Sequence, residues 1–179
     1  MTTGAGTLVV GASQAGVQLA VSLRDAGDTS PITLIGDELH APYQRPPLSK
    51  AFLHSTAGIE DFLLRSADFL SGRGITLVTG ERIETIDLEA GGPRGSATTQ
   101  RGRVLSFDRL ALTVGARPRR LTVPGSDLDR IRYLRTADDA AALRREQADA
   151  RSVVVIGGGF IGLEAAAVAR AQGKSVTLV

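Results

Sequence analysis

Two stretches of the chain, one near its start and one at its end, show the same order of apolar and polar positions. Each opens with a short apolar run, residues 8–10 in the first stretch and 153–156 in the second, that stops at a glycine. Apolar residues then recur three and four positions apart, which is the period of an amphipathic helix. A second apolar run closes each stretch, at residues 32–35 and 176–179. The pattern predicts two strand–helix–strand units of an α/β protein.

The turn between strand and helix has the spacing of a GxGxxG motif in both stretches. In that motif the first glycine makes the tight turn, the second lets the backbone approach a pyrophosphate, and the third lets the helix pack closely on the strand. One such turn can also be a packing turn without a ligand, whereas two copies in one chain favour two dinucleotide sites. The motif positions hold Gly11, Ser13 and Gly16 in the first copy and Gly157, Gly159 and Gly162 in the second.

The first copy departs from the motif at its middle position and is followed by acidic residues. The Ser13 side chain would crowd the pyrophosphate slightly, while its hydroxyl can donate a hydrogen bond to it. After the second strand, Asp37 is a better candidate than Glu38 to accept hydrogen bonds from ribose hydroxyls. The position that corresponds to Asp37 in the second copy lies beyond Val179, so these residues do not decide between NADH and NADPH.

The segment after the first acid is rich in proline, with prolines at three positions between residues 41 and 50. Proline fixes its own φ and restricts the residue before it, so we expect a rigid, extended loop that is neither helix nor central strand. This loop would carry Tyr43, Arg45 and Lys50 past the mouth of the first dinucleotide site. Ser49 is expected to cap a short helix that runs through Leu53.

The middle of the chain supplies further strands. Residues 75–78 and 110–113 are short apolar runs that predict two more parallel strands. Residues 81–88 alternate between apolar and polar, and after a long turn the chain returns at 104–107, which predicts an antiparallel excursion. We therefore expect a parallel sheet within residues 7–113, with helices on both faces, interrupted by this excursion.

A helix then links the two dinucleotide-binding stretches. Thr136 and Asp139 form a pair like a capping box, which predicts a helix that begins there and runs through Ala150. The expected organisation is a first nucleotide-binding domain, a crossover linker with a helix, and the first strand–helix–strand of a second domain. Their bounds are residues 1–115, 116–150 and 151–179.

The amino-acid composition limits the kinds of redox chemistry, partners and metal sites that this chain can have. The 179 residues contain no cysteine, which excludes a disulfide, a redox dithiol or a thiolate-ligated cluster within them, so electron chemistry needs a bound cofactor. The 21 lysines and arginines nearly balance the 19 aspartates and glutamates, so we expect no nucleic-acid partner. His40 and His54 are interpreted as loop residues rather than metal ligands. The apolar runs are shorter than a membrane span and residues 1–6 are too short and polar for a secretory signal, so a cytoplasmic protein without membrane association is expected.

Six short stretches together resemble one family of flavoproteins. In chain order they read GASQAG, GDE, PYQRPPLSK, LTVGARPR, YLRT and GGGFIGLE. This order is similar to that of the FAD-dependent ferredoxin reductases of oxygenase systems, the group of putidaredoxin reductase and the dioxygenase ferredoxin reductases, and it covers nearly the whole chain. The resemblance implies an FAD-binding Rossmann-like parallel sheet with an antiparallel excursion, followed by the start of a second, NAD(P)-binding Rossmann-like domain. The chain would then be roughly the first half of a reductase.

The resemblance also implies an activity. A reductase of this kind transfers a hydride from NAD(P)H to FAD and passes single electrons to a [2Fe–2S] ferredoxin that serves a monooxygenase or dioxygenase. Two alternatives remain: an NAD(P)H oxidase or monodehydroascorbate-type reductase on the same fold, and a flavin-binding fragment without turnover. Relatives built like glutathione reductase carry redox cysteines after the first acid, and their absence here excludes a dithiol mechanism. An exposed cluster of Arg117, Arg119 and Arg120 would either dock an acidic ferredoxin or be simply solvated.

Site residues follow from the resemblance, position by position. Val114 replaces a threonine that the family usually has, which leaves only backbone contact at that position. The implied FAD contacts are Gly11, Ser13, Ala15, Gly16, Asp37, Arg45, Lys50, Ile83, Thr113, Gly115 and Arg135. The implied contacts from the second copy are Gly157, Gly159, Ile161, Gly162 and Glu164. Lys50 and Glu164 are also the implied catalytic pair, whose side chains would meet near the flavin N5: Lys50 would stabilise negative charge on the reduced flavin, and Glu164 would orient Lys50.

Overall fold

The computed structural model describes residues 5–179, which form two compact units. Within the described residues, the first unit comprises residues 5–43 and Leu63–Gly115, and the second comprises Gln44–Phe62 and Ala116–Val179. Residues 44–62 thus group with the second half of the chain, whereas the expected boundaries put them in the first domain; those boundaries stay a prediction. Residues 1–4, which belong to the segment that we interpreted as too short and polar for a signal, lie outside the described residues.

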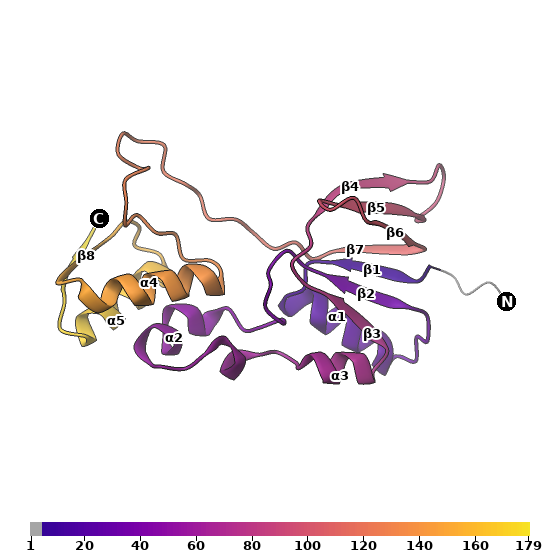
Figure 1. Ribbon diagram of the computed structural model, residues 1–179, viewed down its shortest axis with the longest axis horizontal. Helices are drawn as coiled ribbons and strands as arrows, with labels where there is room; N and C mark the ends of the chain where they lie inside the picture. Colours follow the sequence, from indigo (N-terminus) through magenta and orange to yellow (C-terminus); the bar gives the residue numbers. More distant parts are fainter. Residues whose placement is uncertain (1–4) are drawn as a thin grey trace. The chain divides into compact units, whose positions relative to one another are not determined.

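A four-stranded parallel sheet forms the centre of the first unit (Figure 1). The strands lie in the order β3-β2-β1-β7, and every neighbouring pair is parallel. The register aligns Val10 with Ile35 and Leu112, so the carboxyl ends of these strands meet at one edge of the sheet. In open α/β sheets this is the edge where ligands bind. The bounds are β1 Thr7–Val10, β2 Ile32–Ile35, β3 Ile75–Val78 and β7 Arg109–Leu112.

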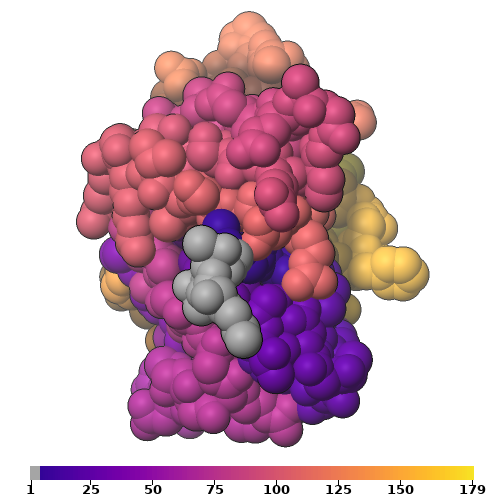
Figure 2. Space-filling model, turned by 90° about the vertical axis from the view of Figure 1, so that its right-hand side faces the viewer, coloured from indigo at the N-terminus to yellow at the C-terminus, as the bar shows by residue number. Residues whose placement is uncertain are grey.

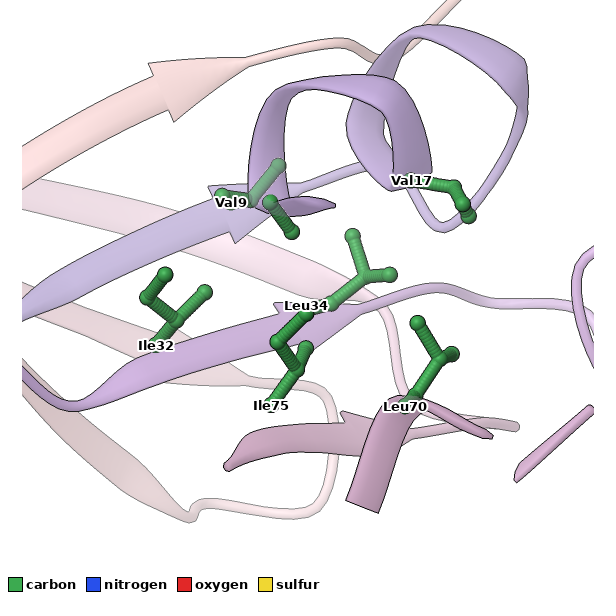
Figure 3. Close-up of a cluster of buried hydrophobic side chains, with 7 residues drawn as sticks. Val9, Val17, Ile32, Leu34, Leu70 and Ile75 are labelled. Atoms are coloured by element: carbon green, nitrogen blue, oxygen red, sulfur yellow. The ribbon is translucent and has the colours of Figure 1, made fainter. Parts of the chain in front are cut away.

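Two helices cover one face of this sheet. α1 (Gln14–Asp25) follows the first glycine turn, and α3 (Ala67–Gly72) begins at Ser66, whose hydroxyl accepts a hydrogen bond from a backbone amide of the first turn. Apolar side chains fill the space between these helices and the strands, as Figure 3 shows. This close packing fixes the N-terminus of α1 at the carboxyl edge of the sheet. The labelled core residues are Val9, Val17, Ile32, Leu34, Leu70 and Ile75.

An antiparallel sheet covers the other face, so the expectation of helices on both faces is wrong. Its strands are β4 (Ile83–Leu88), β5 (Gly95–Thr99) and β6 (Val104–Phe107), in that order. Ala97 and Phe107 from this sheet pack against the parallel strands in a second buried cluster, so strands rather than a helix bury the apolar side chains there. In Figure 2 the sheet, in magenta to salmon, lies on the side of the unit opposite α1 and α3. The expected long turn thus contains a strand, β5.

The second unit contains the second strand–helix–strand stretch. β8 (Ser152–Val155) and β9 (Ser175–Leu178) pair in parallel, and α5 (Phe160–Ala171) connects them. The expected fold class is therefore confirmed: a Rossmann-like parallel sheet with an antiparallel excursion, followed by the start of a second such unit. No helix within residues 5–179 combines the length and the apolar character that crossing a bilayer requires.

The linking helix α4 (Ala137–Asp149) is held at both ends. At its start the expected capping box is confirmed: the Thr136 hydroxyl accepts from the Asp139 amide, and the Asp139 carboxylate accepts from the Thr136 amide. Near its end the buried Lys174 ammonium donates to two backbone carbonyl oxygens, at 2.5 and 2.9 Å. A cation at this place is favourable because the last carbonyls of a helix lack intrahelical partners.

The proline-rich segment is helical where we expected it to be extended. Pro46–Ser49 forms a 3-10 helix, η1, and the chain continues into α2 (Ala51–His54) and a further 3-10 turn, η2 (Ile59–Phe62). Prolines occupy the first positions of η1, where a missing N–H costs nothing because those amides have no helical partner. Lys50, not Ser49, stands at the N-cap of α2, so the expected capping role of Ser49 is also wrong.

Candidate functional site

The first glycine turn is closed by backbone contacts that only glycine permits. Gly11 has a φ of +113°, and a Cβ built there would lie 2.2 Å from the Thr113 carbonyl oxygen. A Cβ on Gly16 would lie 2.2 Å from the Gly11 carbonyl oxygen. Both distances are far below a van der Waals contact, so a side chain at either position would displace the turn or the helix. The first and third motif positions therefore bring strand and helix together as the motif requires.

The N-terminus of α1 offers donors to an anion. Ser13 is its N-cap, with extended backbone angles and a hydroxyl that does not cap the helix. Ala15 is exposed in the first turn, and that turn contains no acidic residue. Free backbone amides and the positive end of the helix dipole favour a phosphate group at such a position. The geometry fits the predicted contacts of Ser13 and Ala15.

Thr113 supports the glycine turn from the next strand. Its Oγ1 lies 2.9 Å from the Gly11 carbonyl oxygen and 3.1 Å from that of Val10, so the hydroxyl donates into the turn. Gly115, two residues on, has a φ of +69°, which suits a chain that turns away at the sheet edge. The Val114 side chain between them is largely exposed. Thr113 thus positions the turn itself, and its predicted cofactor contact stays a prediction.

Asp37 lies at the carboxyl edge of the same sheet, where backbone bonds fix its loop. The Glu81 amide donates to the Gly36 carbonyl and the Gly80 amide to the Glu38 carbonyl, at 3.0 and 2.9 Å. One Asp37 oxygen, Oδ2, lies 3.1 Å from the Arg82 guanidinium, and the side chain is 52% exposed. Arg82 was not predicted as a site residue: it belongs to no motif and only precedes the predicted adenine contact Ile83, which is half-buried at the start of β4.

A pocket of about 240 Å³ lies within the second unit. It is formed by the proline-rich segment, the residues just before α4 and the first turns of α5. Arg45 is fixed across it, because its Nη1 donates to the Arg135 carbonyl oxygen at 2.7 Å. The structure thus brings together five of the predicted site residues in one place. The lining residues are Arg45, Pro46, Leu48, Ser49, Lys50, Leu134, Arg135, Ile161 and Glu164.

Lys50 and Glu164 meet in this pocket. The Lys50 ammonium lies 3.0 Å from Glu164 Oε1, and their side chains are 54% and 28% exposed. The expected pairing is present, while its expected role at a flavin stays a prediction. Ser49, which was not predicted as a site residue, is the third member of this group: its hydroxyl donates to Glu164 Oε2 at 2.5 Å. The only signal for Ser49 was its place beside Lys50, and there we expected it to cap a helix.

These contacts set the charge of Glu164. The hydrogen bond from Ser49, followed by that from Lys50, holds the pKa of Glu164 below its usual value, while partial burial acts in the opposite direction. Hydrogen bonds to the ionised form favour that form, so Glu164 is a carboxylate at neutral pH. The pocket therefore contains a fixed anion facing an ammonium, an arrangement that can hold a cation beside a bound group on which negative charge develops.

The second glycine turn repeats the geometry of the first. Gly157 has a φ of +109°, and a Cβ on Gly162 would lie 2.3 Å from the Gly157 carbonyl oxygen. A Cβ on Gly159, the N-cap of α5, would meet no atom within 4 Å, so packing does not require glycine there and space is open for a pyrophosphate. Ile161 is 52% exposed and lines the pocket.

Comparisons with known proteins agree with this geometry. Residues 6–179 match the family of pyridine nucleotide-disulphide oxidoreductases. Rhodocoxin reductase from Rhodococcus erythropolis is 46% identical over 172 residues, which are 96% of this chain and 39% of that protein. The crystal structure of the ferredoxin reductase for the CYP199A2 system from Rhodopseudomonas palustris superposes with a TM-score of 0.90 at 43% identity, covering 97% of this chain and 42% of that one.

A third relative is a complex. The covalent putidaredoxin reductase–putidaredoxin complex matches with a TM-score of 0.85 at 38% identity, covering 97% of this chain and 41% of that chain. The chain spans about two fifths of the length of the relatives that it matches. It lacks the cysteines to which the family owes part of its name. With its two glycine turns and a family match over nearly its whole length, the chain belongs to the pyridine nucleotide-disulphide oxidoreductases.

Proposed function

We propose that the complete protein is an NAD(P)H-dependent, FAD-containing reductase that passes single electrons to a [2Fe–2S] ferredoxin of an oxygenase system. One observation carries the proposal: Lys50 from the proline-rich segment and Glu164 from the second glycine-turn helix form an ion pair in a shared pocket. The names of the relatives, among them a rhodocoxin reductase and a ferredoxin reductase, support this activity. These 179 residues contain no cysteine, so they supply no redox dithiol after the first acid.

The first unit fits the adenosine diphosphate part of FAD. The N-terminus of α1, which the glycine turn packs against the strand, would bind the pyrophosphate charge through backbone amides and the Ser13 hydroxyl. Asp37 would accept hydrogen bonds from the ribose hydroxyls, and Ile83 would contact the adenine from the start of β4. When bound, the flavin supplies the conversion of a two-electron donor into single electrons.

The second unit fits the nicotinamide side. The turn from Gly157 to Gly162 would bind the NAD(P)H pyrophosphate, and the pocket residues would border the flavin and nicotinamide rings. Lys50 would place its ammonium near the flavin edge that gains charge, and Glu164 would hold Lys50 there. Arg45 and Arg135, already joined by a hydrogen bond, would contact the remaining part of the flavin cofactor. No protein nucleophile is needed for this reaction.

An absorption spectrum of the complete protein, followed by anaerobic titration with NADH and NADPH, tests the cofactor part of the proposal. We expect bound flavin that is bleached by one or both nucleotides. Rates of reduction of a supplied [2Fe–2S] ferredoxin and of oxygen then test the acceptor. Much faster reduction of oxygen would assign the protein to the oxidases on this fold, and a colourless protein that takes up no FAD would reject the flavoprotein assignment.

A further inference from the structure

Ser49 is a buried hydroxyl group inside the charged pocket. Its residue is 4% exposed, at the end of η1 and beside the equally buried Leu48. The Ser49 Oγ lies 2.5 Å from Glu164 Oε2 and 3.5 Å from the Pro46 carbonyl oxygen. A hydroxyl has one proton to donate, and the much shorter distance assigns it to the carboxylate. Ser49 therefore donates its one hydroxyl proton to the Glu164 carboxylate.

Two adjacent residues thus hold one carboxylate through both of its oxygens. Ser49 binds Oε2, and Lys50 lies 3.0 Å from Oε1. A carboxylate bound at a single oxygen can rotate about its last torsion, whereas one bound at both cannot do so without breaking a bond. The Lys50 side chain is 54% exposed and flexible by nature, so its place in the pocket depends on how firmly Glu164 is held.

We propose that Ser49 is a positioning residue: its hydroxyl fixes the Glu164 carboxylate so that the Lys50 ammonium stays at the flavin edge of the pocket. The proposal rests on the function assigned to this pocket above, and it adds a residue to which that function gave no role. Ser49 itself would touch neither nucleotide. It acts through Glu164, and Glu164 acts through Lys50.

Electrostatics support this assignment. Glu164 is the only carboxylate among the residues that line the pocket, and the cations Arg45, Lys50 and Arg135 line the same pocket. The hydrogen bond from Ser49 is the largest single cause of the lowered pKa of Glu164; the hydrogen bond and the charge of Lys50 lower this pKa further, and partial burial opposes them. Without the Ser49 donor the pKa of Glu164 would rise. As the pH falls, Glu164 would then be protonated, and Lys50 released, at a higher pH than in the wild type.

The test compares three variants of the complete protein. Ser49→Ala removes the donor, Ser49→Thr keeps it, and Ser55→Ala is a matched control, because Ser55 is exposed and its hydroxyl bonds to backbone atoms of its own turn. FAD content and the rate of flavin reduction by NADH are measured across the acid pH range. We expect Ser49→Ala to keep its FAD, to be reduced roughly tenfold more slowly and to lose activity at a higher pH than wild type. Ser49→Thr should recover most of the rate and the wild-type pH profile.

Two outcomes overturn the proposal. One is a Ser49→Ala variant with an unchanged rate and pH profile. The other is an equal loss of reduction rate in Ser49→Ala and Ser49→Thr, with no shift in the pH at which activity falls in acid. That result would indicate that Ser49 has a packing role only. The pH titration of the Glu164 carboxyl by NMR in the cofactor-free protein, assigned with Glu164→Gln, gives a readout that needs no flavin. If the wild type binds no FAD, the proposed function fails, and this titration alone decides about Ser49: a higher pKa in Ser49→Ala supports positioning and an unchanged one rejects it.

Discussion

The Lys50 ammonium and the Glu164 carboxylate lie 3.0 Å apart, although they come from distant parts of the sequence. The two residues are brought together by short elements: η1 ends just before Lys50, and the first turns of α5 carry Glu164. An isolated ion pair this exposed contributes little to stability. We therefore expect the ion pair to serve function rather than stability. An ammonium that is held in place can stabilise negative charge that develops on a bound cofactor.

Lys50→Met in the complete protein should slow flavin reduction by NAD(P)H while FAD stays bound. The methionine keeps the unbranched shape of the lysine but removes the ammonium, so negative charge on the reduced flavin loses its stabilising partner. We expect a decrease of roughly tenfold to a hundredfold in the rate constant of reduction, measured by stopped-flow absorbance. Lys50→Arg keeps the charge and should retain most of the rate. A Lys50→Met protein that is reduced as fast as wild type would remove Lys50 from the mechanism.

Asp37→Ala should weaken FAD retention. The residue is at the carboxyl edge of the parallel sheet, and its loop is fixed by backbone hydrogen bonds to the loop after β3. Loss of the carboxylate would leave the ribose hydroxyls without their acceptor, at a cost of about 1–3 kcal/mol in binding. Flavin content after dilution, followed by fluorescence, measures the effect. Asp87→Ala, an exposed acid on β4, is the control, and equal retention by both variants would contradict the ribose assignment.

Sequence patterns predicted the parallel sheet because its strands are short apolar runs, and β1 and β2 are each followed directly by a glycine. The same patterns failed where a segment pairs with strands elsewhere in the sequence, because the composition of the segment does not indicate those partners. The segment Gly95–Thr99 is all glycine, alanine, serine and threonine, which is typical of a turn, yet it pairs with β4 and β6 because both neighbours supply unpaired backbone groups. The prolines of η1 likewise suggested an extended chain, although proline is well accommodated at the first positions of a helix.

The candidate site was predictable to the extent that its residues belong to motifs. Lys50 and Glu164 follow from the resemblance, and their contact is present. Arg82 and Ser49 could not be found in this way, because each matters through a side chain far away in sequence: Arg82 through Asp37 and Ser49 through Glu164. A serine or arginine outside a motif cannot be recognised from the sequence as a site residue. Only the fold shows which carboxylate its side chain contacts.

Gly16→Ala should destabilise the first unit and reduce FAD binding. The added Cβ would lie 2.2 Å from the Gly11 carbonyl oxygen and 2.9 Å from Thr113 Oγ1, so the turn and α1 must move apart. Such overpacking typically costs about 1–3 kcal/mol of unfolding free energy. Gly72→Ala is the matched control, since a Cβ at this helical position meets nothing within 4 Å. Equal unfolding midpoints in denaturant for the two variants would contradict the described packing of the turn.

Asp28→Asn should destabilise the protein at neutral pH but not in acid. Asp28 accepts hydrogen bonds from the Ser30 hydroxyl and amide and pairs with Arg109, and these contacts, the Ser30 hydroxyl first, lower its pKa. A lowered carboxyl pKa stabilises the fold above the pKa of the unfolded chain, and this contribution is lost as the pH falls from the unfolded pKa through the lower, folded pKa.

The thermal unfolding midpoint against pH checks this sign. The difference between wild type and Asp28→Asn should be largest near neutrality and shrink below about pH 4. Asp25→Asn, at an exposed surface pair with Arg73, should change little at any pH. If the difference in unfolding midpoint between wild type and Asp28→Asn stays constant down to pH 3, the charge of Asp28 does not stabilise the fold, and its packing and hydrogen bonds account for the effect.

Reversing the charge of Arg119 and Arg120 together should impair ferredoxin reduction at low salt. Both arginines are exposed in the segment before α4, and Arg120 stacks over the Tyr133 ring with its guanidinium carbon 4.9 Å from the ring centroid, which restrains it. If the cluster attracts an acidic ferredoxin, the double Glu variant should raise the KM for ferredoxin roughly tenfold at low ionic strength. The effect should fade as added salt shortens the screening length to about 8 Å and below. Arg145→Glu with Arg151→Glu, two other exposed arginines of the same unit, controls for net charge, and the same salt dependence in both double variants would mean that the cluster is only solvated surface.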